Sequence, residues 1–279
     1  MEDNKIEKSL AAPAMISDAD FRRLVAFVQQ KYGIDLHQKR QLITSRLAGT
    51  IKQKGFKGYS EYIDYLLSQG SSDDINQLLS KLTTNYTYFM REIGAFEYFQ
   101  STILPDMVRR HQRDKCLAIW SAGCSSGEEP YNVSMYIMDY LGTQASAWDT
   151  RLLATDLSMN ALSKAQKGIY ELPDNLPAGW EKKYFVSAGA GKHQVAPHIK
   201  RNVIFRQFNL MDPIHFKRKF DVIFCRNVMI YFDQPTKKAL TERFYEATVP
   251  GGYLIISMSE NLSPDTPYMR VGPSIFKKK

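Results

Sequence analysis

The segment WSAGCSSGEEPY, residues 120–131, decides the fold class of this chain. An apolar run, Leu117–Ser121, leads into it, and an apolar helical pattern, Tyr131–Leu141, follows it. Two glycines, Gly123 and Gly127, let the backbone turn sharply and approach a bound molecule, because glycine has no Cβ. In open α/β sheets, a strand that turns through such a loop into a helix binds nucleotide-like cofactors. The segment therefore predicts an α/β sheet with a cofactor site at this loop.

The charge of this loop distinguishes it from phosphate-binding loops. It lacks the G-x-G-x-x-G pattern and the Lys-Ser/Thr pair of a P-loop, and Glu128 and Glu129 would repel a pyrophosphate. A cofactor with an ammonium group and no phosphate suits two carboxylates better, and S-adenosylmethionine is such a cofactor. Alternatively, Ser126 and Glu129 form a helix capping box. Pro130 argues against the box, because proline at the first helical position would place Glu129 at the N-cap, where glutamate is disfavoured.

Apolar runs of strand length alternate with helical patterns after residue 95, which predicts a mostly parallel sheet with helices on both faces. The polar stretch 171–201 is too long for a plain connection, so we expect it to hold small strands of its own. The expected strands are Leu117–Ser121, Arg151–Thr155, Val203–Phe208, Phe220–Cys225 and Tyr253–Ser257. The expected helices are Ala95–His111, Tyr131–Leu141, Asn160–Lys167 and Thr236–Thr248.

Polar residues follow several of these strands, at the edge where ligands lie in such sheets. Asp156, after the second strand, is placed to accept hydrogen bonds from ribose hydroxyls. Alternatively it caps the next helix, for which Ser158 is an equal candidate. The residues after the third and fourth strands that would line the ligand crevice are Asn209, Leu210, Arg226 and Asn227.

Four short amphipathic helices are expected before residue 83. Ser17 or Asp18 caps the first, which Gly33 ends, and Asp35 is expected to cap the second. The third begins at Ser60, and the fourth spans residues 73–82. The apolar stripe of the second helix consists of Leu36, Ile43, Leu47 and Ile51. The expected organisation is a flexible tail (1–16), a helical domain (17–82), a linker (83–94) and an α/β domain (95–279) with a β-subdomain at 171–201.

The composition is that of a globular protein, with 44% hydrophobic and 24% charged residues. We expect no membrane span, because no run of 18 apolar residues exists, and the first fourteen residues lack the apolar core of a signal peptide. Three scattered cysteines and five histidines form no disulfide or metal-ligand pattern, so we expect no metal and a cytoplasmic setting. The net charge of +8 attracts anionic partners without naming them.

Four segments carry a family pattern: Thr83–Glu92 (TTN-x-T-x-FFRE), residues 120–131 (WSAxCSxGEEPY), Cys225–Phe232 (CRNVxIYF) and the pair Ser259 and Glu260. Together these segments resemble the chemotaxis receptor methyltransferase family, usually called CheR. The likeness runs in order from about Phe21 to the end of the chain. The chain departs from the family at Met90, where a second Phe is usual, and at Asn132, where Ser is common. Neither change removes a charged or hydrogen-bonding group that the chemistry needs.

The resemblance implies a Rossmann-like S-adenosylmethionine-dependent methyltransferase sheet, with a small N-terminal helical domain and a small inserted β-subdomain. It also implies transfer of a methyl group from S-adenosylmethionine to glutamate side chains in the cytoplasmic helices of chemoreceptors. Arg91 is then expected at the reacting centre, and Tyr231 is expected to orient the substrate. In some members the small β-subdomain also binds a short peptide at the receptor's C-terminus. The cofactor contacts that the family implies are Asn85, Thr87, Arg91, Glu129, Asp156, Asn209, Leu210, Arg226 and Asn227.

The inferred substrate is a carboxylate-rich helix, which a basic surface would guide. Lys39 and Arg46 are seven residues apart in the second helix, so they are expected on one flank of its apolar stripe. A solvated helix face is the simpler interpretation of two such charges. We nevertheless expect these two residues to dock the receptor, because the chain is basic overall.

Two other functions stay open at this level. The positive charge permits a nucleic-acid methyltransferase, but the fourth strand ends in Arg226-Asn-Val-Met instead of the Asn/Asp-Pro-Pro-aromatic motif of amine methylation, so we expect no nucleic-acid partner. A non-catalytic module that senses the cofactor is the second alternative, because fold does not fix function. The intact set of Arg91, Glu129 and Asp156 argues against a loss of activity.

Overall fold

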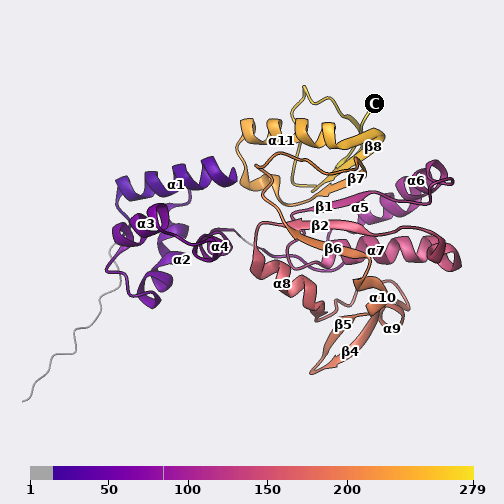
Figure 1. Cartoon of the computed structure of the whole chain (residues 1–279), viewed down its shortest axis with the longest axis horizontal. Helices are drawn as coiled ribbons and strands as arrows, with labels where there is room; N and C mark the ends of the chain where they lie inside the picture. The colour runs from indigo at the N-terminus through magenta and orange to yellow at the C-terminus, as the bar shows by residue number, and fades with distance from the viewer. Residues whose placement is uncertain (1–14, 84) are drawn as a thin grey trace, which may run out of the picture. The chain divides into compact units, whose positions relative to one another are not determined.

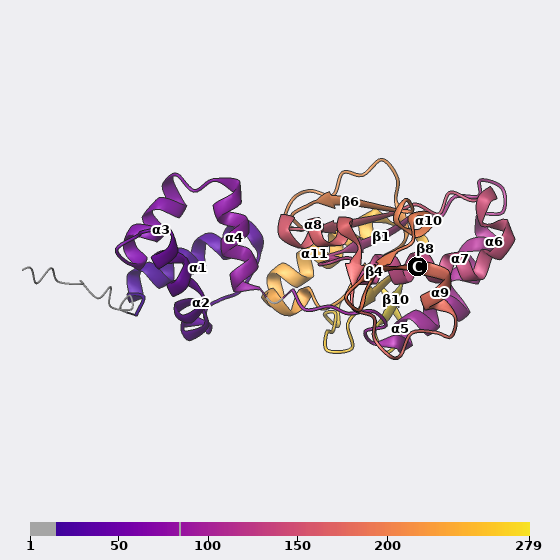
Figure 2. The same cartoon turned by 90° about the horizontal axis from the view of Figure 1, so that it is seen from below.

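The computed structural model describes residues 15–83 and 85–279, so most of the expected tail and Thr84 of the linker lie outside the described residues. The chain divides into two compact units, drawn in Figures 1 and 2. The described part of the helical unit comprises residues 15–31 and 35–83. The α/β unit comprises Tyr32–Ile34 and Asn85–Lys279.

Within the described residues, the helical unit contains α1 (Asp18–Tyr32), α2 (Arg40–Gln53), α3 (Tyr59–Ser68) and α4 (Ser72–Leu82). Ser17 caps α1 as expected, because its hydroxyl accepts a hydrogen bond of 3.1 Å from the Asp20 amide. The prediction that Asp35 caps α2 is wrong. Lys39 is its N-cap residue, while the Asp35 carboxylate accepts a bond of 3.1 Å from the His37 amide in the preceding loop. All four expected stripe residues are buried, although the first precedes the helix: Leu36, Ile43, Leu47 and Ile51.

A buried carboxylate, Asp74, ties α4 to α2 and α3. It forms a capping box with Ser71 and accepts hydrogen bonds from the Tyr65 hydroxyl (2.6 Å) and the Lys54 ammonium (2.5 Å). The Lys54 bond, and then those from Ser71 and Tyr65, lower the pKa of Asp74 far below its usual value. This network has a structural function, because each partner belongs to the helical unit.

The α/β unit is built on a seven-stranded sheet with the order β6-β2-β1-β7-β8-β10-β9. The first five strands in this order pair in parallel, and β10 and β9 complete the sheet in antiparallel fashion. The five strands expected from the sequence are the five parallel ones. The last two were not expected, because each is short. The bounds are β1 Ile119–Ala122, β2 Leu152–Asp156, β6 Val203–Gln207, β7 Phe220–Cys225, β8 Thr248–Ile256, β9 Met269–Gly272 and β10 Ile275–Lys277.

Helices cover both faces of the sheet, as Figure 1 shows for α11 on one side and α7 on the other. Trp120 of β1 packs against Phe244 of α11 with ring centroids 5.4 Å apart. Phe224 of β7 packs against Phe99 at 5.4 Å. The expected long helix at residues 95–111 contains a π-turn just before Pro105, which has no amide hydrogen to donate. The bounds are α5 Ile93–Tyr98, η1 Phe99–Ile103, α6 Leu104–Arg110, α7 Glu128–Leu141, η2 Gly142–Ala147, α8 Met159–Lys167, η3 Met229–Tyr231 and α11 Gln234–Ala247.

A small β-subdomain, residues 169–200, is inserted between α8 and β6. Its antiparallel sheet has the order β3-β5-β4, which confirms the small strands expected there. Asp139 of α7 anchors it by accepting bonds of 2.5 Å from both the Trp180 indole and the Tyr184 hydroxyl. The bounds are β3 Ile169–Tyr170, α9 Trp180–Tyr184, β4 Phe185–Gly189, β5 Lys192–Val195 and α10 Pro197–Lys200.

Candidate functional site

The glycine loop, residues 123–127, leaves β1 at the carboxyl edge of the parallel strands. The amides of Gly123 and Cys124 both donate to the Thr155 carbonyl at 2.8 Å, so β2 fixes the start of the loop. Gly123 and Gly127 have φ values of +86° and +96°. A Cβ on Gly123 would lie 2.3 Å from Val228 Cγ2. Glycine is therefore required by both backbone conformation and packing at the first position.

The two glutamates after the loop have different surroundings. The helix α7 begins at Glu128, so Pro130 is its third residue and not its first. The N-cap residue is Gly127, so the prediction that proline would place Glu129 at the N-cap is wrong. The capping box is also absent, since the Ser126 hydroxyl donates to Glu128 at 2.8 Å. Glu129 accepts bonds from the Ser121 hydroxyl (2.7 Å) and from Arg226 (3.0 Å). Burial raises the pKa of Glu128.

Asp156 lies at the end of β2, beside the glycine loop. Its carboxylate accepts one bond of 2.8 Å from the Ser125 amide and one of 2.8 Å from the Ser158 amide. The cap of α8 is Ser158, whose hydroxyl accepts from the Ala161 amide at 3.2 Å. Burial raises the pKa of Asp156. Each carboxylate oxygen can accept more than one hydrogen bond, so Asp156 keeps acceptor capacity for a ligand.

Arg226, which follows β7, joins the loop to the linker. Its side chain is 2% exposed and donates to Glu129 Oε2 at 3.0 Å. It also donates to the backbone carbonyl of Arg91 and to Glu92 Oε2, the latter at 3.4 Å. The guanidinium lies over the Phe96 ring, 4.9 Å from its centre. One buried cation thus connects two segments that are more than thirty residues apart in the sequence.

A second part of the cluster contains residues that the sequence analysis did not assign to the site. Glu92 accepts hydrogen bonds from Ser257 (2.8 Å) and Asn227 (3.3 Å). Glu260 accepts from the amides of Asn227 (3.1 Å) and Ser257 (2.8 Å). Burial raises the pKa of Glu92, but the bonds from Ser257 and Met258 and the charge of Arg226 outweigh it, so this pKa is lowered. Ser257 directly follows β8, but the strand expected at residues 253–257 included it, so its position at a strand end was not recognised.

The remaining candidates of the α/β unit lie near the same edge of the sheet. The Asn85 carbonyl accepts from the Ser125 hydroxyl at 3.1 Å, and Arg91 Nη1 donates to the Tyr86 carbonyl at 2.6 Å. Asn209 accepts from the Met211 amide at 3.1 Å. These hydrogen bonds form two sets: Ser125 links Asn85 to Asp156, and Arg226 with Glu92 links Arg91, Glu129 and Asn227. The bonds of these two sets do not include Thr87, Asn209, Leu210 and Tyr231.

The two docking candidates differ in exposure. Lys39 is exposed and stands one residue before the helix α2. Arg46 is half-buried, and its guanidinium donates to the carbonyls of Lys81 (2.8 Å) and Thr83 (3.3 Å) at the end of α4. Arg46 therefore helps to hold the helical unit together, and Lys39 is the more available of the two charges.

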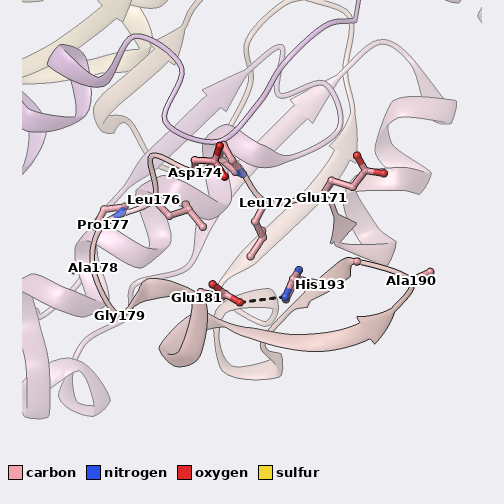
Figure 3. A pocket seen from close by; sticks show the side chains of 12 residues that line it. Glu171, Leu172, Asp174, Leu176, Pro177, Ala178, Gly179, Glu181, Ala190 and His193 are labelled. Atoms are coloured by element: carbon pink, nitrogen blue, oxygen red, sulfur yellow. Dashed lines mark ion pairs between the residues drawn. The ribbon is translucent and has the colours of Figure 1, made fainter.

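The β-subdomain contains a cavity of about 650 Å³, and Figure 3 shows the side chains that line it. No residue of the glycine loop is among the lining residues. Leu172 and Leu176 contribute apolar side chains to it. Glu181 and His193 also line it, and their side chains form an ion pair of 3.4 Å. With Glu171 and Asp174 among the lining residues as well, the cavity is acidic.

The chain matches two known protein domains. Residues 85–274 match the domain described as "CheR methyltransferase, SAM binding domain", and residues 19–83 match "CheR methyltransferase, all-alpha domain". The chain belongs to the CheR methyltransferase family. It is 38% identical to the chemotaxis protein methyltransferase of Borreliella burgdorferi over 94% of this chain and 95% of that protein. It is 35% identical to chemotaxis protein methyltransferase 2 of Vibrio cholerae over 89% of this chain and 88% of that protein.

As a member of the CheR family, the chain is a methyltransferase whose cofactor is S-adenosylmethionine. The residues at the glycine loop fit this cofactor. Two carboxylates, Glu129 and Asp156, suit an ammonium group and ribose hydroxyls, and both are only partly buried. Among the described residues, no group of His, Cys, Asp and Glu could hold a metal ion, and no helix is long and apolar enough to cross a membrane.

Proposed function

We propose that this chain methylates glutamate side chains of chemoreceptors in chemotaxis adaptation, forming glutamate methyl esters. The relatives from Borreliella burgdorferi and Vibrio cholerae are named chemotaxis protein methyltransferases. The observation that carries the proposal is the Arg226 cluster, in which a buried guanidinium holds Glu129 beside the glycine loop and the Arg91 carbonyl in the linker. Through this side chain, two of the segments that carry the resemblance to CheR contact one group.

In the proposed site, the residues of the cluster bind and orient the cofactor. S-adenosylmethionine supplies a methyl group activated by its sulfonium centre. Glu129 holds the ammonium group, and Asp156 accepts hydrogen bonds from the ribose hydroxyls with its remaining acceptor capacity. The other contacts proposed from the family are Asn85, Thr87, Arg91, Asn209, Leu210, Arg226 and Asn227.

Arg91 and Tyr231 are the proposed residues at the reacting centre. The Arg226 guanidinium holds the Arg91 carbonyl, which fixes the linker backbone at this point. The half-buried Arg91 side chain then binds a carboxylate, either that of the cofactor or that of the incoming glutamate. Tyr231, on η3, orients the glutamate. No strong general base is needed, because a glutamate with a pKa of about 4.3 is ionised at neutral pH.

The proposed partners are the cytoplasmic helices of chemoreceptors. Lys39, with a smaller contribution from Arg46, guides their carboxylates at long range. A C-terminal receptor segment is the proposed occupant of the β-subdomain cavity. Because that cavity is lined by Glu171, Asp174 and Glu181 together with two leucines, it favours a segment that carries a basic residue beside an apolar one.

Labelled S-adenosylmethionine, incubated with the protein and chemoreceptor membranes, tests the proposal. We expect labelled receptor that releases methanol in mild alkali, as a carboxyl methyl ester does. Alkali-stable label would contradict glutamate methylation and indicate methylation on nitrogen. Receptors whose target glutamates are changed to alanine are expected to stay unlabelled.

The variant Arg91→Ala tests the assigned reacting centre. A charge-assisted hydrogen bond is worth about 1.5–3 kcal/mol, so transfer should fall by at least tenfold. Arg109→Ala is the matched control, because Arg109 is 79% exposed and pairs with Asp106 on α6. Near-normal turnover of Arg91→Ala would show that Arg91 lies outside the reacting centre.

A further inference from the structure

One residue of the β-subdomain reaches the glycine loop. The Tyr170 hydroxyl donates to the backbone carbonyl of Ser126 at 2.6 Å, and the residue is 9% exposed. Its ring packs edge-on against Phe89 of the linker, with centroids 5.0 Å apart. A Cβ on Gly127 would lie 3.1 Å from the Tyr170 hydroxyl oxygen. Tyr170 therefore contacts the loop through both a hydrogen bond and close packing.

The position of this contact within the loop matters for the cofactor site. Ser125 precedes it and donates its amide to Asp156, while Gly127 follows it as the N-cap residue of α7. A shift of Ser126 would therefore move both the partner of Asp156 and the start of the helix that carries Glu129. The bonds from Gly123 and Cys124 to Thr155 hold the first half of the loop, and the Gly127 amide donates to the Cys124 carbonyl at 3.0 Å within the loop itself.

Tyr170 is well suited to be a permanent donor. Burial raises the pKa of its hydroxyl far above the usual value, so it stays protonated at any physiological pH. Its backbone is fixed by the antiparallel pairing of β3 with β5, in which Tyr170 faces His193. The sheet of the β-subdomain thus sets where this hydroxyl lies.

We propose that Tyr170 is a positioning residue through which the β-subdomain fixes the second half of the glycine loop, so that cofactor affinity depends on the subdomain. The inference rests on the proposed function only for the identity of the cofactor site. On this inference the β-subdomain helps to hold the cofactor site in place, in addition to any contact that the subdomain makes with a receptor.

The test compares two tyrosine-to-phenylalanine variants of the same subdomain. Tyr170→Phe removes the hydroxyl that binds Ser126, and Tyr184→Phe removes the hydroxyl that binds Asp139 at 2.5 Å, with no contact to the loop. Affinity for S-adenosylhomocysteine, measured by calorimetry on the full chain, should fall by about threefold to tenfold in Tyr170→Phe. It should be unchanged in Tyr184→Phe. In turnover, Tyr170→Phe should raise the KM for the methyl donor without changing the KM for receptor.

Hydrogen exchange of the ligand-free protein separates the failure of this inference from failure of the proposed function. The loop amides of Ser125, Ser126 and Gly127 should exchange faster in Tyr170→Phe than in wild type, and at the wild-type rate in Tyr184→Phe. If the wild type does not bind S-adenosylhomocysteine, the proposed function fails, while faster loop exchange in Tyr170→Phe still supports the positioning role. Unchanged loop exchange in Tyr170→Phe, or equal acceleration in both variants, overturns the inference.

Discussion

Each unit of the molecule buries a charged group, but Asp74 in the helical unit and Arg226 in the α/β unit hold different kinds of structure. Asp74 is 5% exposed and receives Lys54, Tyr65 and Ser71, which join three regular helices. Arg226 is 6% exposed and joins the linker, at the Arg91 carbonyl, to Glu129, which follows the glycine loop. The comparison shows that burial of a charge alone does not mark a functional site. A functional site is indicated instead by which segments the charge connects, and by the position of those segments at the carboxyl edge of the sheet.

Backbone strain separates the two networks further. Among the described residues, four of the six non-glycine positive φ values occur in the segments of the site, at Met90 (64°), Glu92 (54°), Ser125 (49°) and Asn227 (59°). The other two occur elsewhere in the α/β unit, at Lys115 (52°) and Ala190 (50°). The described part of the helical unit has positive φ only at glycine, at Gly55. Left-handed backbone at residues other than glycine costs about 1–3 kcal/mol each and persists where surrounding contacts enforce it. The α/β unit therefore concentrates its strain at the proposed cofactor site.

The largest effect is expected for Arg226→Gln. This change leaves the carboxylates of Glu129 and Glu92 without their cation, and breaking a buried pair costs about 3–5 kcal/mol. We expect a large loss of stability in the α/β unit and no calorimetrically detectable binding of S-adenosylhomocysteine. Urea unfolding followed by tryptophan fluorescence measures the first effect, because all three tryptophans lie in this unit. Wild-type affinity in this variant would show that the Arg226 cluster only supports the fold.

Asp74→Ala should affect stability alone. It removes the capping box and leaves the partly buried Lys54 ammonium without its partner, so the helical unit should lose about 2–4 kcal/mol. Affinity for S-adenosylhomocysteine should not change, because the proposed cofactor residues belong to the other unit. Asp73→Ala is the control, since Asp73 is the exposed neighbour in the same helical turn. A loss of cofactor affinity in Asp74→Ala alone would contradict the separation of the two networks.

The sequence predicted the regular parts of the molecule well, because hydrophobic periodicity reports burial directly. The parallel strands β2 and β7 match their expected runs to within one residue. The antiparallel pair β9 and β10 escaped this reasoning, because strands of 4 and 3 residues carry too little pattern. The cap of α2 was misassigned because Asp35 binds the His37 amide in a turn of its own, which competes with the helix.

The candidate site was predictable only residue by residue. Strand-end reasoning selected Asp156 and Arg226, and the resemblance selected Arg91. The sequence did not predict the hydrogen-bond partners of the site residues. Glu92, for example, accepts a hydrogen bond from Ser257, which is 165 positions away in the sequence. Such pairings depend on the tertiary fold, and no local pattern encodes them. The contact from Tyr170 to the glycine loop is of the same kind.

A third network, at the half-buried His111, provides a pH-dependent comparison. The carboxylates of Asp221 (2.8 Å) and Asp114 (2.9 Å) accept hydrogen bonds from the two ring nitrogens of His111. These bonds tie the end of α6 to the start of β7, opposite the end that carries Arg226. Burial lowers the pKa of His111, but the two aspartates outweigh this and raise it above 6.5.

Because the folded pKa is raised, His111 stabilises the protein fully below pH 6.5, and this contribution is lost as pH rises through the folded pKa. We expect the free energy of unfolding to fall by less than about 1 kcal/mol as the pH rises through this pKa, since the ring is partly solvated. His111→Gln should remove this pH dependence in urea titrations between pH 6 and 9. It should leave S-adenosylhomocysteine affinity unchanged. A pH dependence that survives in His111→Gln would assign it to other groups.

The smallest effect is expected at the surface of the helical unit, where Lys39 is exposed and Arg46 is not free to serve only a partner. Reversing Arg46 would also break its bonds to the carbonyls at the end of α4, so Lys39→Glu is the cleaner test of receptor docking. An exposed charge pair contributes about 0.2–1 kcal/mol, which corresponds to an increase of at most about fivefold in the KM for receptor. The increase should disappear at high salt, because exposed charges are screened beyond about 8–10 Å.

Lys217→Glu is the control, since it makes the same change in net charge at an exposed site of the α/β unit. If both variants raise the KM equally, the overall charge of the protein attracts the receptor, and Lys39 has no specific part in docking.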